Sequence, residues 1–206
     1  MKIYKNIIFD LGGVILTIDY SKTIEAFGNI GIQESKILYS KSNQTSLFDE
    51  LEKGRITDQE FITTIRSKTK TAVTDDQIRD AWNALLIGLP DENIRILKEL
   101  KKNHRLFLLS NTNSIHEQAY RKMIVDQCGT FIFDDLFEKM YLSHQIHMRK
   151  PDAEIFHHVL TDSQLNINET CFIDDSLQHV QGAQSVNLPA FHLKDDLVSF
   201  ANSFIN

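Results

Sequence analysis

The chain has 206 residues, a net charge of −6 and 42% hydrophobic residues, which suits one globular domain or a core domain with a small insertion. The acidic balance argues against a broad nucleic-acid surface, and no apolar segment is long enough to span a bilayer. The two cysteines suggest no disulfide framework and the N-terminus lacks signal-peptide features. We therefore expect a cytoplasmic protein that binds neither nucleic acid nor membrane.

The first predicted strand covers residues 7–9 and ends at Asp10, and a long helical block follows it. Residues 19–88 carry apolar stripes at helical spacing and two pairs that fit a capping box. We expect this block to be helical throughout and to form a small cap domain inserted after the first strand. The alternative is a plain helical layer of a single domain.

The rest of the chain alternates helices with apolar strands. Helices are predicted over 91–100, 114–125, 152–160 and 177–185, and strands over 106–109, 139–142, 171–173 and 189–193. Such alternation is typical of a parallel sheet with right-handed crossovers. We therefore predict an α/β fold with a doubly wound, Rossmann-like core of residues 1–18 and 89–206 and an inserted α-helical cap of residues 19–88.

Polar residues follow the three strongest predicted strands: Asp10, Ser110 with Asn111, and Asp174 with Asp175. Ligands of an open parallel sheet bind outside the carboxyl ends of its strands, so we expect these residues to share one site. Each signal is weak alone, because aspartate, serine and asparagine often only cap a following helix. The signal is their common position at strand ends.

Three carboxylates and one lysine give this site its expected chemistry. Asp10, Asp174 and Asp175 at close range repel one another, and a hard cation such as Mg²⁺ relieves that repulsion. Lys150 precedes Pro151, which can open a helix, so its side chain is expected to reach the site from a helix entry. Together with N–H groups at a helix start, this set suits phosphoryl transfer.

Four segments, in this order, resemble the motifs of the haloacid dehalogenase-like (HAD) hydrolase superfamily. They are residues 7–16 (IIFDLGGVIL), 109–112 (LSNT), 149–156 (RKPDAEIF) and 172–183 (FIDDSLQHVQGA). Their order and separation match over nearly the whole chain, and the helical block lies where that family places its first-type cap. The greatest similarity is to sugar-phosphate phosphatases of the glucose-1-phosphate type, which have a glycine two places after the nucleophile.

The resemblance implies a Mg²⁺-dependent phosphatase that acts on a small phosphorylated metabolite, as a monomer or a homodimer. Asp10 would be the nucleophile and would form an aspartyl-phosphate. Lys150 would bind the phosphoryl group and neutralise Asp10. The other phosphate contacts would come from Ser110 and from the backbone amides of Leu11 and Asn111.

The same resemblance implies a metal site. Mg²⁺ would be held by Asp10, by Asp174 and by the backbone carbonyl oxygen of Gly12. Asp175 would be an additional ligand or the partner of one. Gln178 and His179 lie where the family often has an acidic or amide residue. Either could orient a water ligand but neither adds charge, so we expect somewhat weaker metal binding than is usual.

Gly12 departs from the family pattern. Most phosphatases of the superfamily have an aspartate there, which protonates the leaving oxygen and later activates water. Such general acid–base help is typically worth about 10²–10⁴-fold in rate. Our hypothesis is that Asp19, the nearest acidic substitute, or a bound water does this work. The alternative is that Asp19 caps a helix that starts near Ser21.

Two other functions stay open at this point. A dehalogenase would use the same aspartate to attack carbon, and Gly12 leaves room for this, because dehalogenases also lack the second aspartate. They do not need the metal that Asp174 and Asp175 favour, so dependence on Mg²⁺ separates the two enzymes. A non-catalytic module would bind a phosphorylated ligand without hydrolysing it.

Overall fold

The core is a five-stranded parallel sheet in a computed structural model that describes residues 4–32, 39–40, 43–44, 46–70 and 72–205. Its strands are β1 (Asn6–Phe9), β6 (Arg105–Ser110), β7 (Lys139–Leu142), β8 (Thr170–Asp174) and β9 (Ala190–His192). Their spatial order is β7-β6-β1-β8-β9, and every neighbouring pair is parallel. The predicted doubly wound α/β core is therefore confirmed.

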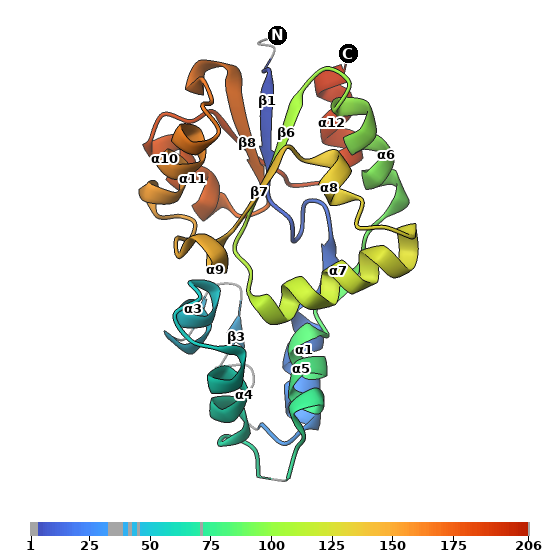
Figure 1. Cartoon of the computed structure of the whole chain (residues 1–206), viewed down its shortest axis with the longest axis vertical. Helices are drawn as coiled ribbons and strands as arrows, with labels where there is room; N and C mark the ends of the chain where they lie inside the picture. Colours follow the sequence, from blue (N-terminus) through green and yellow to red (C-terminus); the bar gives the residue numbers. More distant parts are fainter. Residues whose placement is uncertain (1–3, 33–38, 41–42, 45, 71, 206) are drawn as a thin grey trace.

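Helices cover both faces of the sheet (Figure 1). One face packs against α10 (Ala153–Asp162) and α11 (Leu177–Ser185), and the other against α6 (Asp91–Leu100), α7 (Ser114–Cys128), α8 (Phe133–Leu136) and α12 (Leu197–Ile205). The alternation of side chains along β1 explains this: Ile8 joins the first layer, while Ile7 and Phe9 join the second. Buried residues on both faces are the reason why the strands read as continuous apolar runs.

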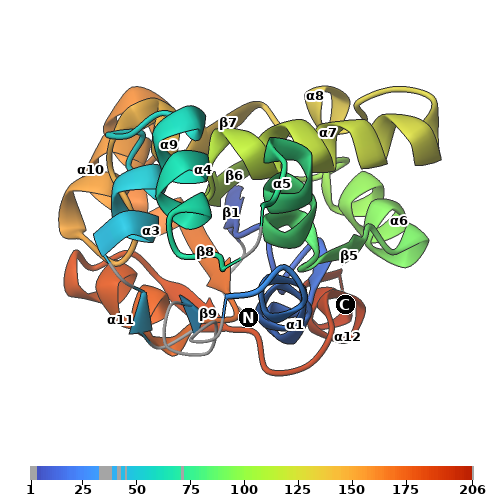
Figure 2. The ribbon, with the colours of Figure 1, turned by 90° about the horizontal axis from the view of Figure 1, so that it is seen from below.

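The helical block lies beyond the carboxyl ends of the strands (Figures 1 and 2). Its helices are α1 (Tyr20–Asn29), α3 (Ser46–Glu52), α4 (Asp58–Arg66) and α5 (Asp75–Asn83). They share a core around Trp82, whose ring centre lies 5.0 Å from that of Phe48 and 5.4 Å from that of Phe61. Both predicted capping boxes are confirmed, one at the start of α4 and one at the start of α5.

The prediction that residues 19–88 are helical throughout is wrong. β2 (Thr17–Ile18) pairs antiparallel with β5 (Leu86–Gly88), and β3 (Tyr39–Ser40) pairs with β4 (Asn43–Gln44). The β2–β5 pair forms because the two connections between the core and the block run side by side, so their backbone groups can bond each other. Whether the block is a separate domain stays a prediction.

Short elements complete the core. They are α9 (Ser143–Ile146), which follows β7 directly, and the 3₁₀ turn η1 (Ile167–Glu169) before β8. None of the helices in the described part of the chain has both the length and the apolar character that crossing a bilayer requires.

Candidate active site

Strand ends bring the first candidate residues together. Asp10 directly follows β1, which lies between β6 and β8 in the sheet. Ser110 is the last residue of β6, and Asp174 is the last residue of β8. The three side chains therefore meet at one edge of the sheet, as their positions in the sequence predicted.

Lys150 lies at the centre of this group. Its Nζ is 2.8 Å from Oδ1 of Asp10 and 2.7 Å from Oδ2 of Asp174. The lysine and Asp174 are fully buried, and Asp10 is almost so. Charges are kept in a protein interior only when they are paired, so these three residues form one unit.

The two aspartates of this unit differ in their protonation behaviour. Burial, reinforced by the charge of Asp174, raises the pKa of Asp10 above its usual range. Burial opposes ionisation of Asp174 too, but Lys150 and His179 outweigh it and hold the pKa of Asp174 below the usual value. The pKa of Lys150 is raised, since its two carboxylate partners outweigh its own burial. One lysine thus leaves Asp10 incompletely neutralised, which favours a further cation.

The donor set near this unit fits a divalent cation. Ligand atoms of Asp10, Asp174 and His179 all lie within 4.8 Å of one another. His179 Nδ1 is 3.0 Å from Asp174 Oδ2 and 3.1 Å from its Oδ1, so the imidazole orients this carboxylate. Buried carboxylate oxygens are the ligands that Mg²⁺ prefers, so the residues fit that ion.

Asp175 approaches the same place from the turn after β8. A Cβ atom on Gly13 would come within 2.5 Å of Asp175 Oδ2, and Gly13 has a φ of +80°. Only glycine takes this conformation without strain and leaves the carboxylate its place. Asp175 lines the cavity described below, next to Gly12.

The predicted phosphate-binding residues lie around the nucleophile candidate. Leu11, Ser110 and Asn111 all line the same cavity as Asp10. The Asn111 side chain has a role that the sequence did not suggest. Its Nδ2 donates to the carbonyl oxygen of Lys150, and its Oδ1 accepts from the Lys150 N–H, each at 2.9 Å. This pair of bonds fixes the backbone from which Lys150 reaches the carboxylates.

An apolar side chain occupies the space beside Gly12. A Cβ atom on Gly12 would lie 2.9 Å from Cδ1 of Ile18. An aspartate at this position would therefore push against Ile18, which comes from β2 at the base of the helical block. Because this atom is the movable end of a side chain, the contact hinders an aspartate here but does not exclude one.

Asp19 is placed as a helix cap. Its Oδ1 accepts from the backbone N–H of Ser21 at 2.9 Å and from the Ser21 hydroxyl at 2.6 Å, at the start of α1. These bonds lower the pKa of Asp19, whereas a proton donor needs a raised one. Among the described residues that line the cavity Asp19 does not appear, although its neighbours Ile18 and Tyr20 do. The geometry therefore favours the capping alternative over the acid–base hypothesis.

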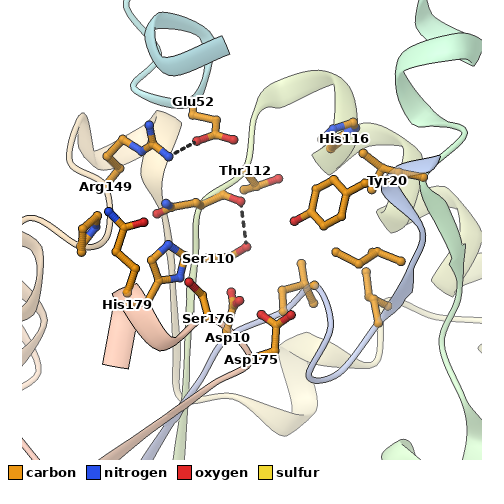
Figure 3. Close-up of a pocket in the computed structure, with 18 of the residues that line it drawn as sticks. Asp10, Tyr20, Glu52, Ser110, Thr112, His116, Arg149, Asp175, Ser176 and His179 are labelled. Atoms are coloured by element: carbon orange, nitrogen blue, oxygen red, sulfur yellow. Dashed lines mark hydrogen bonds and ion pairs between the residues drawn. The ribbon is translucent and has the colours of Figure 1, made fainter. Parts of the chain in front are cut away.

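A cavity of about 380 Å³ separates the strand ends from the helical block (Figure 3). Sequence reasoning missed much of its wall. Tyr20 extends into it from the side opposite His179, and its pKa is raised by burial and by the nearby Asp10. His116 and Tyr120 line it from α7. The sequence offered one signal that these two residues act together: they are four residues apart in a predicted helix, which places both side chains on one helix face.

An ion pair joins the helical block to the core at the cavity rim. Arg149 Nη2 lies 3.0 Å from Oε2 of Glu52, a buried residue of α3 (Figure 3). The same guanidinium pairs with Asp49. Arg149 directly precedes Lys150. The third motif therefore supplies both the buried lysine and the contact with the helical block.

Comparisons with known proteins agree with this geometry. The family model for haloacid dehalogenase-like hydrolases matches residues 4–187. A D-ribitol-5-phosphate phosphatase from Bacteroides thetaiotaomicron is 30% identical over 91% of this chain and 90% of its own. A HAD family enzyme from that organism, crystallised with magnesium and inorganic phosphate, is 36% identical and has a TM-score of 0.82, with 93% of this chain and 94% of that chain covered. A HAD-like family hydrolase from Porphyromonas gingivalis is 30% identical and has a TM-score of 0.86, with 100% and 99% covered. This chain belongs to the haloacid dehalogenase-like hydrolase family.

Proposed function

We propose that this chain is a Mg²⁺-dependent phosphomonoesterase that hydrolyses a small phosphorylated metabolite. The observation that carries the proposal is the buried unit in which Lys150 bridges Asp174 and Asp10, and Asp10 in turn lines the cavity. A nucleophilic carboxylate, a fixed cation and a place for a metal ion are the parts that phosphoryl transfer requires.

The reaction proceeds in two displacements on phosphorus. A carboxylate oxygen of Asp10 attacks the phosphorus, the bond to the ester oxygen breaks, and the leaving oxygen takes a proton from a water molecule and departs as the alcohol. Water then attacks the aspartyl-phosphate, which releases inorganic phosphate and restores Asp10. Lys150, Ser110 and the backbone N–H groups of Leu11 and Asn111 bind the phosphoryl oxygens and hold the group in line for attack.

Three groups would hold the metal ion: the carboxylates of Asp10 and Asp174 and the backbone carbonyl oxygen of Gly12. Asp175 would add a ligand or hold a water ligand in place. When bound, Mg²⁺ would offset the negative charge of the phosphoryl oxygens. His179 keeps the Asp174 carboxylate in a fixed orientation and so serves the same site.

The size and closure of the cavity support a small substrate. Its volume of about 380 Å³ is near the lower end of the range for small-molecule sites. The helical block covers the strand ends, which favours a metabolite over a macromolecule. The relative that is named a D-ribitol-5-phosphate phosphatase supports an alditol or sugar phosphate. A cytoplasmic location and a monomeric or dimeric state stay predictions.

A panel of phosphate esters tests the proposal. Phosphate release is measured with and without Mg²⁺ for the native chain and for Asp10→Asn, with Asp134→Asn, an exposed aspartate, as the matched control. We expect Mg²⁺-dependent release by the native chain and by Asp134→Asn, and a loss of at least about 10⁴-fold in Asp10→Asn. Ester binding without release would indicate a non-catalytic module. A 2-haloacid is assayed in parallel, and halide release from it without Mg²⁺ would indicate a dehalogenase.

A further inference from the structure

Two buried polar atoms have no hydrogen-bond partner among the described residues: Nε2 of His116 and the hydroxyl of Tyr120. Both residues are buried, and both line the cavity. They lie one turn apart on α7, so their side chains occupy the same helix face. We call this pair the neutral wall.

The imidazole of His116 is fixed in orientation and in tautomer. Its ring stacks on Trp82 with ring centres 4.4 Å apart and an interplanar angle of 24°. Its Nδ1 lies 2.8 Å from Oδ1 of Asn83, and an amide oxygen only accepts, so the proton is on Nδ1. Burial lowers the pKa of His116 to about 3, so the ring is neutral at physiological pH. Nε2 is therefore a hydrogen-bond acceptor.

The Tyr120 side chain offers a complementary group. Its ring stacks on Phe131 at 6.4 Å, and burial raises the pKa of its hydroxyl, which stays protonated. A phenol both donates and accepts, whereas Nε2 of His116 only accepts. A single alcohol group of a ligand could therefore donate to the imidazole and accept from the phenol.

Leaving such groups unpaired is costly. A buried polar atom without a partner costs about 1–3 kcal/mol, and most buried polar atoms in native proteins have one. Two such atoms on the wall of the cavity that holds Asp10 indicate that a ligand supplies the partner. A hydroxyl can donate to Nε2 and accept from the phenol at once, whereas a carboxylate has no proton to donate and an ammonium group has no lone pair with which to accept.

We propose that His116 and Tyr120 bind a hydroxyl in the alcohol part of the substrate and so select polyhydroxylated phosphate esters over aliphatic ones. The inference rests on the proposed function, because it assigns the leaving-group end of the same cavity. Both residues act on specificity and do not take part in bond breaking.

The test compares two esters of equal chain length, ribitol 5-phosphate and pentyl phosphate, which lacks the hydroxyls. Tyr120→Phe removes one oxygen atom, and Tyr141→Phe is the matched control. Tyr141 is equally buried, but its hydroxyl bonds Asp162 and Ser163 and it does not line the cavity in the described part of the chain. For Tyr120→Phe we expect kcat/KM for ribitol 5-phosphate to fall about tenfold, mainly through KM, with pentyl phosphate unchanged. Tyr141→Phe should leave the ratio between the two esters unchanged.

A second variant, His116→Phe, keeps the stacking ring and removes Nε2 together with the Nδ1 bond to Asn83, and it should shift the ratio in the same direction. If both variants lower the two rates equally, or leave both unchanged, the inference is wrong.

Binding separates this inference from the proposed function. Calorimetric titration of both esters in the presence of Mg²⁺ is made into Asp10→Asn and into Asp10→Asn combined with Tyr120→Phe. We expect tighter binding of ribitol 5-phosphate in the first protein, and about a tenfold loss of that preference in the second. If the native chain hydrolyses no ester, the proposed function fails, and the binding preference still decides whether the neutral wall recognises hydroxyls. Equal binding of both esters to Asp10→Asn overturns the inference.

Discussion

The two ends of the cavity are built in different ways. At the charged end, formed by Asp10, Lys150 and Asp174, each ionic group is paired inside the protein. At the neutral wall, His116 and Tyr120 keep polar atoms that find no partner in the described part of the chain. The two aspartates of the charged end lie at the ends of parallel strands and Lys150 reaches them from a loop, while the neutral wall belongs to one helix.

The difference separates chemistry from recognition. Strand ends hold the reacting groups in positions fixed by a buried sheet, and such preorganised charge is what stabilises a transition state. His116 and Tyr120 of the neutral wall each have a polar atom without a partner in the described part of the chain. These atoms can therefore contribute hydrogen-bond energy only when a ligand is bound. Substitutions at the charged end should therefore lower the rate of the reaction, whereas substitutions at the neutral wall should change the preference between substrates.

Metal removal should have the largest effect, and only on the chemistry. Treatment with a chelator is expected to lower kcat by about 10²–10³-fold, because uncompensated charge remains on Asp10 and on the phosphoryl oxygens. Steady-state assays before and after Mg²⁺ is returned give the measurement. A chelated enzyme that keeps its full rate would break the distinction between the two ends.

Lys150→Met should destabilise the fold as well as abolish turnover. The variant leaves two buried carboxylates without their shared cation, and removal of one partner from a buried pair costs about 3–5 kcal/mol. Urea unfolding measures the change. Lys139→Met is the control, because its ion pair with Asp162 is largely exposed and its loss should cost at most about 1 kcal/mol. If both variants lose the same free energy of unfolding, Lys150 is not the essential partner of the two buried carboxylates.

Glu52→Gln should have a smaller effect, at the contact between the helical block and the core. Arg149 loses its buried partner but keeps Asp49, so we expect the free energy of unfolding to fall by about 1.5–3 kcal/mol. Glu50→Gln is the matched control on the same helix, since Glu50 pairs with Arg55 at the surface. If Glu50→Gln loses as much stability as Glu52→Gln, the ion pair between Arg149 and Glu52 stabilises the fold no more than a surface pair does.

Glu117→Gln tests the contribution of the Glu117 carboxylate on α7 to stability through its pH dependence. His144 and Arg121 bond Glu117 and lower its pKa to about 2, despite an opposing contribution from burial. A depressed carboxyl pKa stabilises the fold above the unfolded value, near 4.5, and this stability is lost as the pH falls towards 2. The melting temperature of Glu117→Gln should therefore lie below that of the native chain at pH 7, and the difference should shrink on acidification. A constant difference would exclude the ionised carboxylate as its cause.

Asp19→Asn should have the smallest effect. Asparagine caps helices about as well as aspartate, so the start of α1 is expected to be kept and turnover to stay within about twofold. A fall of about 10²–10⁴-fold would restore the hypothesis that Asp19 is the acid–base residue. Phosphate release with one good ester is a sufficient measurement.

The sequence predicted those parts of the fold in which local pattern and burial agree. The segments 139–142, 91–100 and 177–185 occur with the predicted bounds, since apolar period and end signals coincide there. The β2–β5 pair was missed because its two short partners lie about 70 residues apart and Leu86 looked like the end of a helical stripe. A strand of two or three residues is too short to show the alternation of apolar and polar residues that identifies strands in a sequence.

The candidate site likewise contains residues that the sequence could bring together and residues that it could not. Asp10, Ser110 and Asp174 could be brought together from the sequence because topology alone joins the ends of neighbouring parallel strands. Tyr20 and His116 could not, since their positions depend on how the helical block packs against the core. No local pattern encodes a contact of that kind.

Arg149 and Lys150, consecutive residues of one loop, bind different parts of the molecule. Arg149 pairs with Glu52 on the helical block, and Lys150 is buried between the carboxylates of the sheet. A planar peptide keeps their Cα atoms about 3.8 Å apart, so a rotation of the loop that moves one side chain moves the other. We therefore expect that a shift of the helical block which moves Arg149 also moves Lys150, and with it the cation that faces Asp10.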